Sequence, residues 1–98
     1  MEFSGFDWDD GNRAKCRKHG VSTEMIERLF QQGLAILPDA AHSRDEKRFK
    51  AVGKTERGRA VFVVFTLRRR GGVVLIRPIS ARYMHRKEVE LYEKGNET

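Results

Sequence analysis

The chain has 98 residues, of which 39% are hydrophobic and 35% are charged. This length and balance predict one globular domain over residues 1–98 and exclude a disordered chain. No apolar run approaches the ~18–20 residues of a membrane span, and the acidic start MEFSGFDWDD lacks the apolar core of a signal peptide. A single cysteine cannot form an intrachain disulfide, so we expect a cytoplasmic protein.

The positive charge is concentrated in the middle of the chain. The whole sequence carries +6, but residues 47–87 hold 13 Lys/Arg against one Asp/Glu, whereas residues 1–46 and 88–98 are each net −3. Such a block is typical of a protein that binds a polyanion, such as RNA or DNA. An acidic protein partner, or only a well-solvated basic surface, would account for the same pattern.

The first third of the chain predicts a short strand and two helices. Apolar and acidic residues alternate in FDWD (6–9), which indicates a strand. A helix of about ten residues should follow, capped by one of the aspartates after Trp8 and ended by His-Gly at 19–20. A second helix should run from the N-cap Ser22 to Gly33, because apolar residues recur between them at helical spacing.

Extended segments dominate from residue 34 onward. Apolar or alternating residues predict four strands, at 34–37, 48–55, 60–68 and 72–82. ERGR (56–59) and RRGG (69–72) are typical hairpin connections, while the polar residues 39–47 predict an exposed loop. A charged helix is expected over residues 85–94. The expected fold class is therefore α+β: a mostly antiparallel meander with two N-terminal helices and one C-terminal helix.

The residues that usually carry metal or nucleophilic chemistry are scattered. The three histidines are at positions 19, 42 and 85, and one cysteine cannot build a thiolate site. We therefore expect no metal and no cofactor. Cys16 has cationic neighbours, but its place in the middle of a helix favours a packing role over a nucleophile.

The segment IRPISAR (76–82) combines arginines with a proline that is unusual in a strand. Ser80 and Arg82 should share a face because they are two residues apart, and Arg77 should point to the other face of a regular strand. Pro78 lacks an N–H and favours an edge or a bulge, which would bring Arg77 onto the face of Arg82. The alternative is that these arginines are solvated edge residues that oppose aggregation.

Arginine side chains suit the chemistry of RNA cleavage. The planar guanidinium binds phosphate through two hydrogen bonds and keeps its charge at any working pH. The 2′-hydroxyl of RNA can attack the adjacent phosphorus, so a protein need only orient the attack, stabilise the phosphorane charge and help move protons. Arg and Lys can stabilise that charge without a metal ion, and His, Tyr, Glu or Lys can serve the proton steps.

The chain resembles the BrnT-type toxins of bacterial type II toxin–antitoxin systems over nearly its whole length. The resemblance rests on motifs in the family's order: FDWD (6–9), RKHGVS (17–22), VFVVFTLR (61–68), IRPISAR (76–82) and E-x-x-x-Y-E (88–93). It implies a compact fold similar to RelE-type ribonuclease toxins. It also implies a metal-independent endoribonuclease that cuts RNA in the bacterial cytoplasm and inhibits translation. Pro78 departs from the family, which usually has an aliphatic residue there.

The resemblance further implies a cognate antitoxin of BrnA type, which would carry the DNA-binding domain through which the complex contacts operator DNA. The candidate catalytic residues are Arg68, Arg77, Arg82, Ser80, His19 and Glu88. Candidate RNA-binding residues are Lys18, Lys50, Arg69 and Arg86. Several of these have structural alternatives: His19 as part of a helix cap, Ser80 as a strand residue, and Glu88 as a salt-bridge partner.

Two functions remain open from the sequence. The first is an RNA-cleaving toxin held inactive by its antitoxin. The second is a non-catalytic module whose basic face docks an acidic antitoxin segment or DNA and acts in operon autoregulation. Both predict salt-sensitive binding to polyanions, so binding alone does not separate them.

Overall fold

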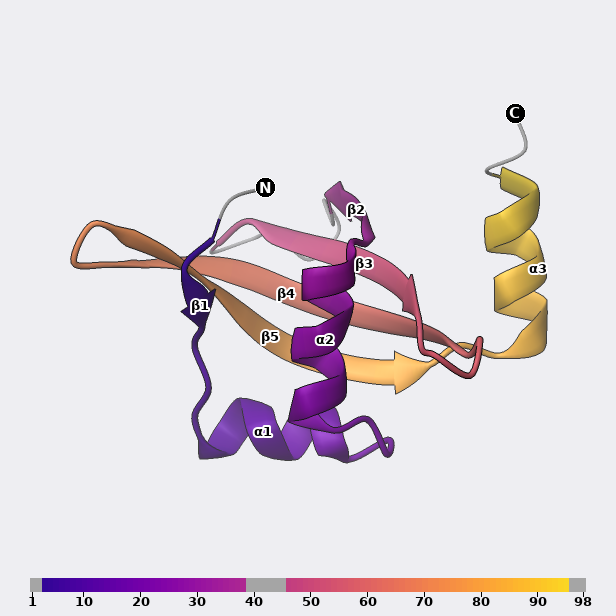
Figure 1. Ribbon diagram of the computed structural model, residues 1–98, viewed down its shortest axis with the longest axis horizontal. Coiled ribbons are helices and arrows are strands. Elements are labelled where there is room, and N and C mark those ends of the chain that lie inside the picture. The colour runs from indigo at the N-terminus through magenta and orange to yellow at the C-terminus, as the bar shows by residue number, and fades with distance from the viewer. Residues whose placement is uncertain (1–2, 39–45, 96–98) are drawn as a thin grey trace.

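The computed structural model describes residues 3–38 and 46–95, which form three helices and one five-stranded sheet (Figure 1). The helices are α1 (Asp10–Arg17), α2 (Thr23–Gln32) and α3 (Arg86–Gly95). The strands are β1 (Gly5–Phe6), β2 (Ala35–Pro38), β3 (Arg48–Lys54), β4 (Ala60–Arg70) and β5 (Val73–Tyr83). The expected α+β class is confirmed. The part of the expected 39–47 loop before residue 46 lies outside the described residues.

The sheet has the strand order β1-β5-β4-β3-β2 and is mixed. Strands β2 to β5 pair antiparallel, and the hairpin signals predicted this for β3–β4 and for β4–β5, but β1 pairs parallel with β5. The predicted strand at residues 6–9 is wrong beyond Phe6. The backbone leaves the sheet after Asp7, whose N–H donates to the Ile76 carbonyl at 2.8 Å, because Asp9 must already cap α1.

Both N-terminal helices begin with caps that the sequence indicated. The Asp9 and Asn12 side chains form a capping box, each accepting from the other's backbone N–H, at 2.9 and 2.7 Å. The Ser22 hydroxyl accepts from the Met25 N–H at 3.1 Å. Helix α1 ends at Arg17, earlier than expected, and Gly20 adopts φ 84° in the turn that follows, a conformation that suits glycine.

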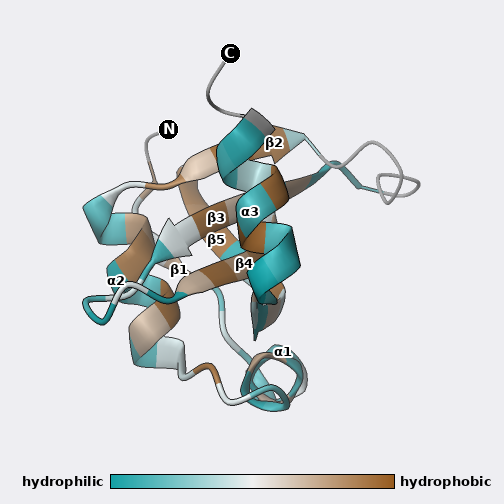
Figure 2. Ribbon diagram, turned by 90° about the vertical axis from the view of Figure 1, so that its right-hand side faces the viewer, coloured by the Kyte–Doolittle hydropathy of each residue, from teal (hydrophilic) through white to brown (hydrophobic). Residues whose placement is uncertain are grey.

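The hydrophobic core lies between one face of the sheet and helices α1 and α2 (Figure 1). The largest fully buried side chains include Phe65, Ile26, Leu29 and Ile76. Figure 2 shows hydrophobic residues concentrated in the strands and in α2. Cys16 is 0% exposed, and burial raises the pKa of its thiol to about 11, so the structure supports the packing role.

Helix α3 stands at the end of the sheet away from the β4–β5 turn (Figure 1). Its Val89 and Tyr92 line an apolar groove of about 610 Å³ with Leu34 and Val52. An ion pair between Lys54 Nζ and Glu93 Oε1, at 3.1 Å, links the helix to β3. Within the described part of the chain, no helix is long and apolar enough to cross a membrane.

Candidate functional site

Strand pairing places three rows of residues on the sheet face opposite α1 and α2. The rows are Arg48–Thr66–Arg77, Lys50–Val64–Ser80 and Val52–Phe62–Arg82. Directly paired residues of neighbouring antiparallel strands project to the same side, so each row lies on one face. We call this surface the arginine face and define it by these nine residues together with Arg68, which faces Leu75 in the next row.

A bulge in β5 brings Arg77 and Arg82 to the same face. Val64 faces Ser80 and the next residue, Phe65, faces Pro78, so Ile79 has no partner on β4. In a regular strand Arg77 and Arg82 would project to opposite faces, because an odd number of positions separates them. The extra residue restores the common face. The expectation that Pro78 marks an irregularity is therefore confirmed.

Arg82 is held by Glu88, the third residue of α3. Its Nη1 and Nη2 atoms lie 2.7 and 2.8 Å from Oε1 and Oε2 of Glu88, a two-point ion pair. The Arg82 guanidinium also lies 5.0 Å from the centroid of the Phe62 ring, its neighbour in the row. Arg82 and the backbone N–H of His85 lower the pKa of Glu88 to about 2, and Glu88 in turn raises the pKa of Arg82.

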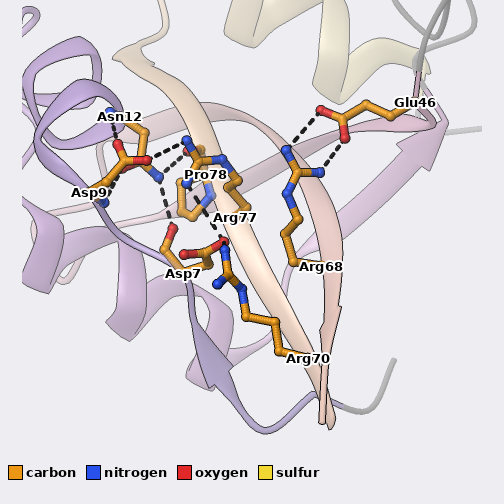
Figure 3. A network of polar contacts seen from close by, with 8 residues as sticks. All are labelled: Asp7, Asp9, Asn12, Glu46, Arg68, Arg70, Arg77 and Pro78. Carbon is orange, nitrogen blue, oxygen red and sulfur yellow. Dashed lines mark hydrogen bonds and ion pairs between the residues drawn. The ribbon is translucent and has the colours of Figure 1, made fainter. Parts of the chain in front are cut away.

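Arg77 is held by the acidic residues that precede α1 (Figure 3). Its Nη2 donates to Asp9 Oδ2 at 2.7 Å, and its Nη1 lies 3.7 Å from Asp7 Oδ2. Arg70 contributes a second cation, with Nη2 donating to the same Asp7 oxygen at 3.2 Å. The Asn12 N–H and the Arg77 guanidinium hold the pKa of Asp9 below its ordinary value. A recess of about 150 Å³ borders Arg77.

Arg68 completes the set of paired arginines. Its guanidinium forms an ion pair with Glu46, two residues before β3 begins, and this contact raises the pKa of Arg68 (Figure 3). The Thr66 hydroxyl donates to the Lys47 carbonyl at 2.8 Å, which ties the same region of β4 to the chain entering β3. Each of the three candidate arginines on this face therefore has a carboxylate partner within the chain.

Four predicted site residues lie away from the arginine face. Lys18 and His19 are exposed in the turn between α1 and α2, on the side of the sheet that these helices cover (Figure 1). Arg69 faces Val74 and projects to the side opposite Arg68. Arg86 opens α3 with its Nε 3.4 Å from Glu90 Oε1. Their roles stay predictions, and the structure brings none of them into the three rows.

Sequence reasoning missed the residues that hold the arginines. These residues are Asp7, Asp9, Asn12 and Glu46. Arg70, which shares Asp7 with Arg77, was also missed. Three of these precede or begin α1, far from β5 along the chain, so no local motif connects them. Among residues 3–38 and 46–95, no group of three or more His, Cys, Asp or Glu side chains is arranged to hold a metal ion.

The fold is that of a small α+β protein whose sheet carries a row of arginines on one face. The family model for BrnT, described as the ribonuclease toxin of type II toxin–antitoxin systems, matches residues 8–88. This match spans most of the sequence, so the chain belongs to the BrnT family of ribonuclease toxins. Its partner in such a system is an antitoxin protein. No curated protein matches the chain.

Proposed function

We propose that the arginine face is the active site of a metal-independent endoribonuclease. In this reaction the 2′-hydroxyl of RNA attacks the adjacent phosphorus, the P–O5′ bond breaks, and a cyclic phosphate and a 5′-hydroxyl end form. The observation that carries the proposal is the β5 bulge, which gives Arg77, Ser80 and Arg82 one common face. Guanidinium groups suit this step because they bind phosphate oxygens bidentately and stabilise the charge of the phosphorane.

The spacing of the rows supports a substrate that lies along the strands. Arg82, Ser80 and Arg77 face Phe62, Val64 and Thr66, so each row is two β4 residues from the next. Two residues of an antiparallel strand span about 6.8 Å, which is close to the length of one nucleotide of extended backbone. We assign Arg77 and Arg82 to the phosphates, Ser80 to a phosphate oxygen between them, and Arg68 to transition-state charge.

The carboxylate partners preorganise these arginines and leave donors for RNA. A guanidinium carries five N–H groups, and Arg82 uses two of them on Glu88. Glu88 holds Arg82 in place and is also our candidate for a proton-transfer step, although its lowered pKa favours the ionised base. His19 and Lys18 stay candidate contacts for RNA that extends beyond the face, together with Lys50, Arg69 and Arg86.

The wider role follows from the family. We propose that the protein inhibits translation by cutting RNA and that a BrnA-type antitoxin neutralises it. Operator DNA would be bound only through the antitoxin in that complex. A sheet with most strands antiparallel and with helices α1 and α2 packed against one face supports a RelE-like assignment of the fold.

Induction in a bacterial host without antitoxin, with mapping of RNA 5′ ends, tests the proposal. Arrested growth with new 5′-hydroxyl ends is expected for the native chain. Arg77→Ala and Arg82→Ala should each stop the growth arrest and lower the cleavage rate by a factor on the order of 100 to 1,000. Arg17→Ala, which removes the same charge from the exposed end of α1, should do neither. Purified protein should cut RNA equally well with and without a metal chelator.

Normal growth and intact RNA, with folded protein present, would reject the nuclease. The protein would then be a non-catalytic module whose arginine face binds the antitoxin or nucleic acid. If cleavage occurs but both arginine variants remain fully toxic, the activity stands and the assignment of its residues is wrong.

A further inference from the structure

Asn12 is a buried polar residue on α1 whose side chain reaches β5. It is 4% exposed, and its Nδ2 group donates to the carbonyls of Asp7 and Pro78 at 2.9 and 2.8 Å (Figure 3). Its Oδ1 accepts from the Asp9 N–H at 2.7 Å, which completes the capping box. Every polar atom of this side chain is therefore bonded, and its partners come from both sides of the α1–β5 junction.

The hydrogen bond from Asn12 to the Pro78 carbonyl fixes the peptide group between Pro78 and Ile79, at the bulge. A bulge interrupts the ladder to the neighbouring strand, and a buried carbonyl there still needs a donor. The Pro78 side chain is fully buried, and the Pro78 carbonyl accepts a hydrogen bond from the side-chain amide of Asn12. The bulge places Arg77 on the same face as Arg82. Asn12 binds the backbone directly before the unpaired residue that makes the bulge.

The capping box gives Asn12 a second hold on Arg77, through Asp9. The side chain of Asn12 holds the Asp9 backbone through Oδ1, which accepts from the Asp9 N–H. One carboxylate oxygen of Asp9 accepts from the backbone N–H of Asn12 at 2.9 Å, and the other accepts from Arg77 Nη2 at 2.7 Å. The N-terminus of α1 thus orients the carboxylate that orients the arginine. Only an amide of this length offers two donors and an acceptor together, since aspartate has no donor when ionised and alanine has neither.

We infer that Asn12 is a positioning residue that fixes both the β5 bulge and the counter-ion of Arg77, and so aims Arg77 at the scissile phosphate of RNA. The inference rests on the function proposed above for Arg77. Asn12 itself is buried and touches no substrate, and its effect on catalysis passes entirely through Arg77.

Steady-state cleavage of a single-stranded RNA oligonucleotide by Asn12→Ala and Asn12→Asp tests this. Asn12→Asp keeps the acceptor for the Asp9 N–H and removes both donors. Small misplacements of a catalytic group cost on the order of a hundredfold, so kcat should fall by roughly that factor in both variants while KM stays within about twofold. Ser22→Ala is the matched control: it removes the α2 cap and lowers Tm by about 4–8 °C, yet should leave kcat unchanged.

The double variant Asn12→Ala/Arg77→Ala distinguishes positioning from general stability. If Asn12 acts through Arg77, the double variant should cleave no more slowly than Arg77→Ala alone. Two results would overturn the inference. One is a double variant whose loss of cleavage rate equals the product of the two single losses. The other is an Asn12→Ala protein that cleaves at the native rate well below its Tm.

A structural measurement keeps the inference separate from the proposed function. If the native protein cuts no RNA, the proposed function fails. NMR of Asn12→Asp then tests the positioning role of Asn12 by itself. Shifts at the Arg77 Nε–H and the amides of Ile79 and Ser80, in addition to those of α1 around the substituted residue and absent from Ser22→Ala, support the positioning role. Unchanged resonances at those three groups overturn it.

Discussion

Arg82 and Glu88 face each other where β5 meets α3, joined by two Nη–Oε contacts of 2.7 and 2.8 Å. The pair fixes a residue of the arginine face and the first turn of α3 at once. Glu88 also accepts from the His85 N–H at 2.9 Å, so the same carboxylate caps the start of the helix. The position of α3 and the orientation of Arg82 are therefore coupled through one side chain.

Acid should weaken the fold through Glu88. Arg82 and the His85 N–H lower the pKa of Glu88 to about 2 from an ordinary value of 4.5. A carboxyl with a lowered folded-state pKa contributes stability that is fully present above the unfolded-state pKa and is lost as pH falls through the folded-state pKa. The free energy of unfolding should therefore decrease between about pH 5 and pH 2. Urea titrations across this range, with Glu88→Gln as the control that has a shallower slope, measure the effect.

Replacing Arg82 by lysine should reduce activity although the charge is kept. An ammonium is a point charge that does not reproduce the two-point contact with Glu88 or the fork that receives a phosphate. We expect kcat/KM to fall roughly tenfold to a hundredfold, between the native protein and Arg82→Ala. Cleavage assays on purified variants with equal Tm provide the comparison, and a lysine variant of native activity would contradict the bidentate role.

RNA affinity should depend steeply on salt, and the arginine face should set the slope. Each phosphate neutralised on a single strand contributes about −0.7 to the slope of log association constant against log salt. Arg68→Ala should make the slope shallower by about 0.7, because its guanidinium projects on this face. Arg17→Ala, which removes the same charge from the exposed end of α1, gives the matched comparison in fluorescence anisotropy titrations.

Gly53 should resist substitution for reasons of space. A Cβ at this position would overlap the Leu34 side chain and lie 3.1 Å from Leu29 Cδ2, and Leu29 is only 2% exposed. Overpacking of this kind costs about 1–3 kcal/mol, so Gly53→Ala should lower the free energy of unfolding within that range. Gly5→Ala is the control, because its Cβ would meet Leu75 at an ordinary 3.6 Å. Equal urea midpoints for the two variants would contradict the prediction.

Local patterns predicted most of the elements. The N-caps at Asp9 and Ser22, the β4–β5 hairpin and the irregularity at Pro78 each depend on residues close together in the sequence. The strand at 6–9 was wrong because the alternation of FDWD does not reveal that Asp9 is needed as a cap. The parallel pairing of β1 with β5 has no local signal either.

The candidate site was predicted only in part, for the same reason. The arginines were visible because their charge and spacing are local, and the common face of Arg77 and Arg82 followed from the proline. Their partners were not visible: Asp9 and Asn12 lie 68 and 66 positions from the β5 residues they bind. Such pairs exist only once α1 packs against the end of the sheet, and a single sequence contains no trace of that contact.

The unpaired residue of β5 also affects which changes in chain length this protein can tolerate during evolution. Loss of one codon, that of Ile79, would remove the bulge and leave a regular strand. Arg77 and Arg82 would then lie four positions apart in a regular strand, so both would stay on the arginine face, and Ala81 would stay opposite Val63. This single-residue deletion would therefore leave the three rows of the arginine face intact. We expect that relatives without this bulge carry the two corresponding arginines four positions apart, and that both lengths of the strand present the same face.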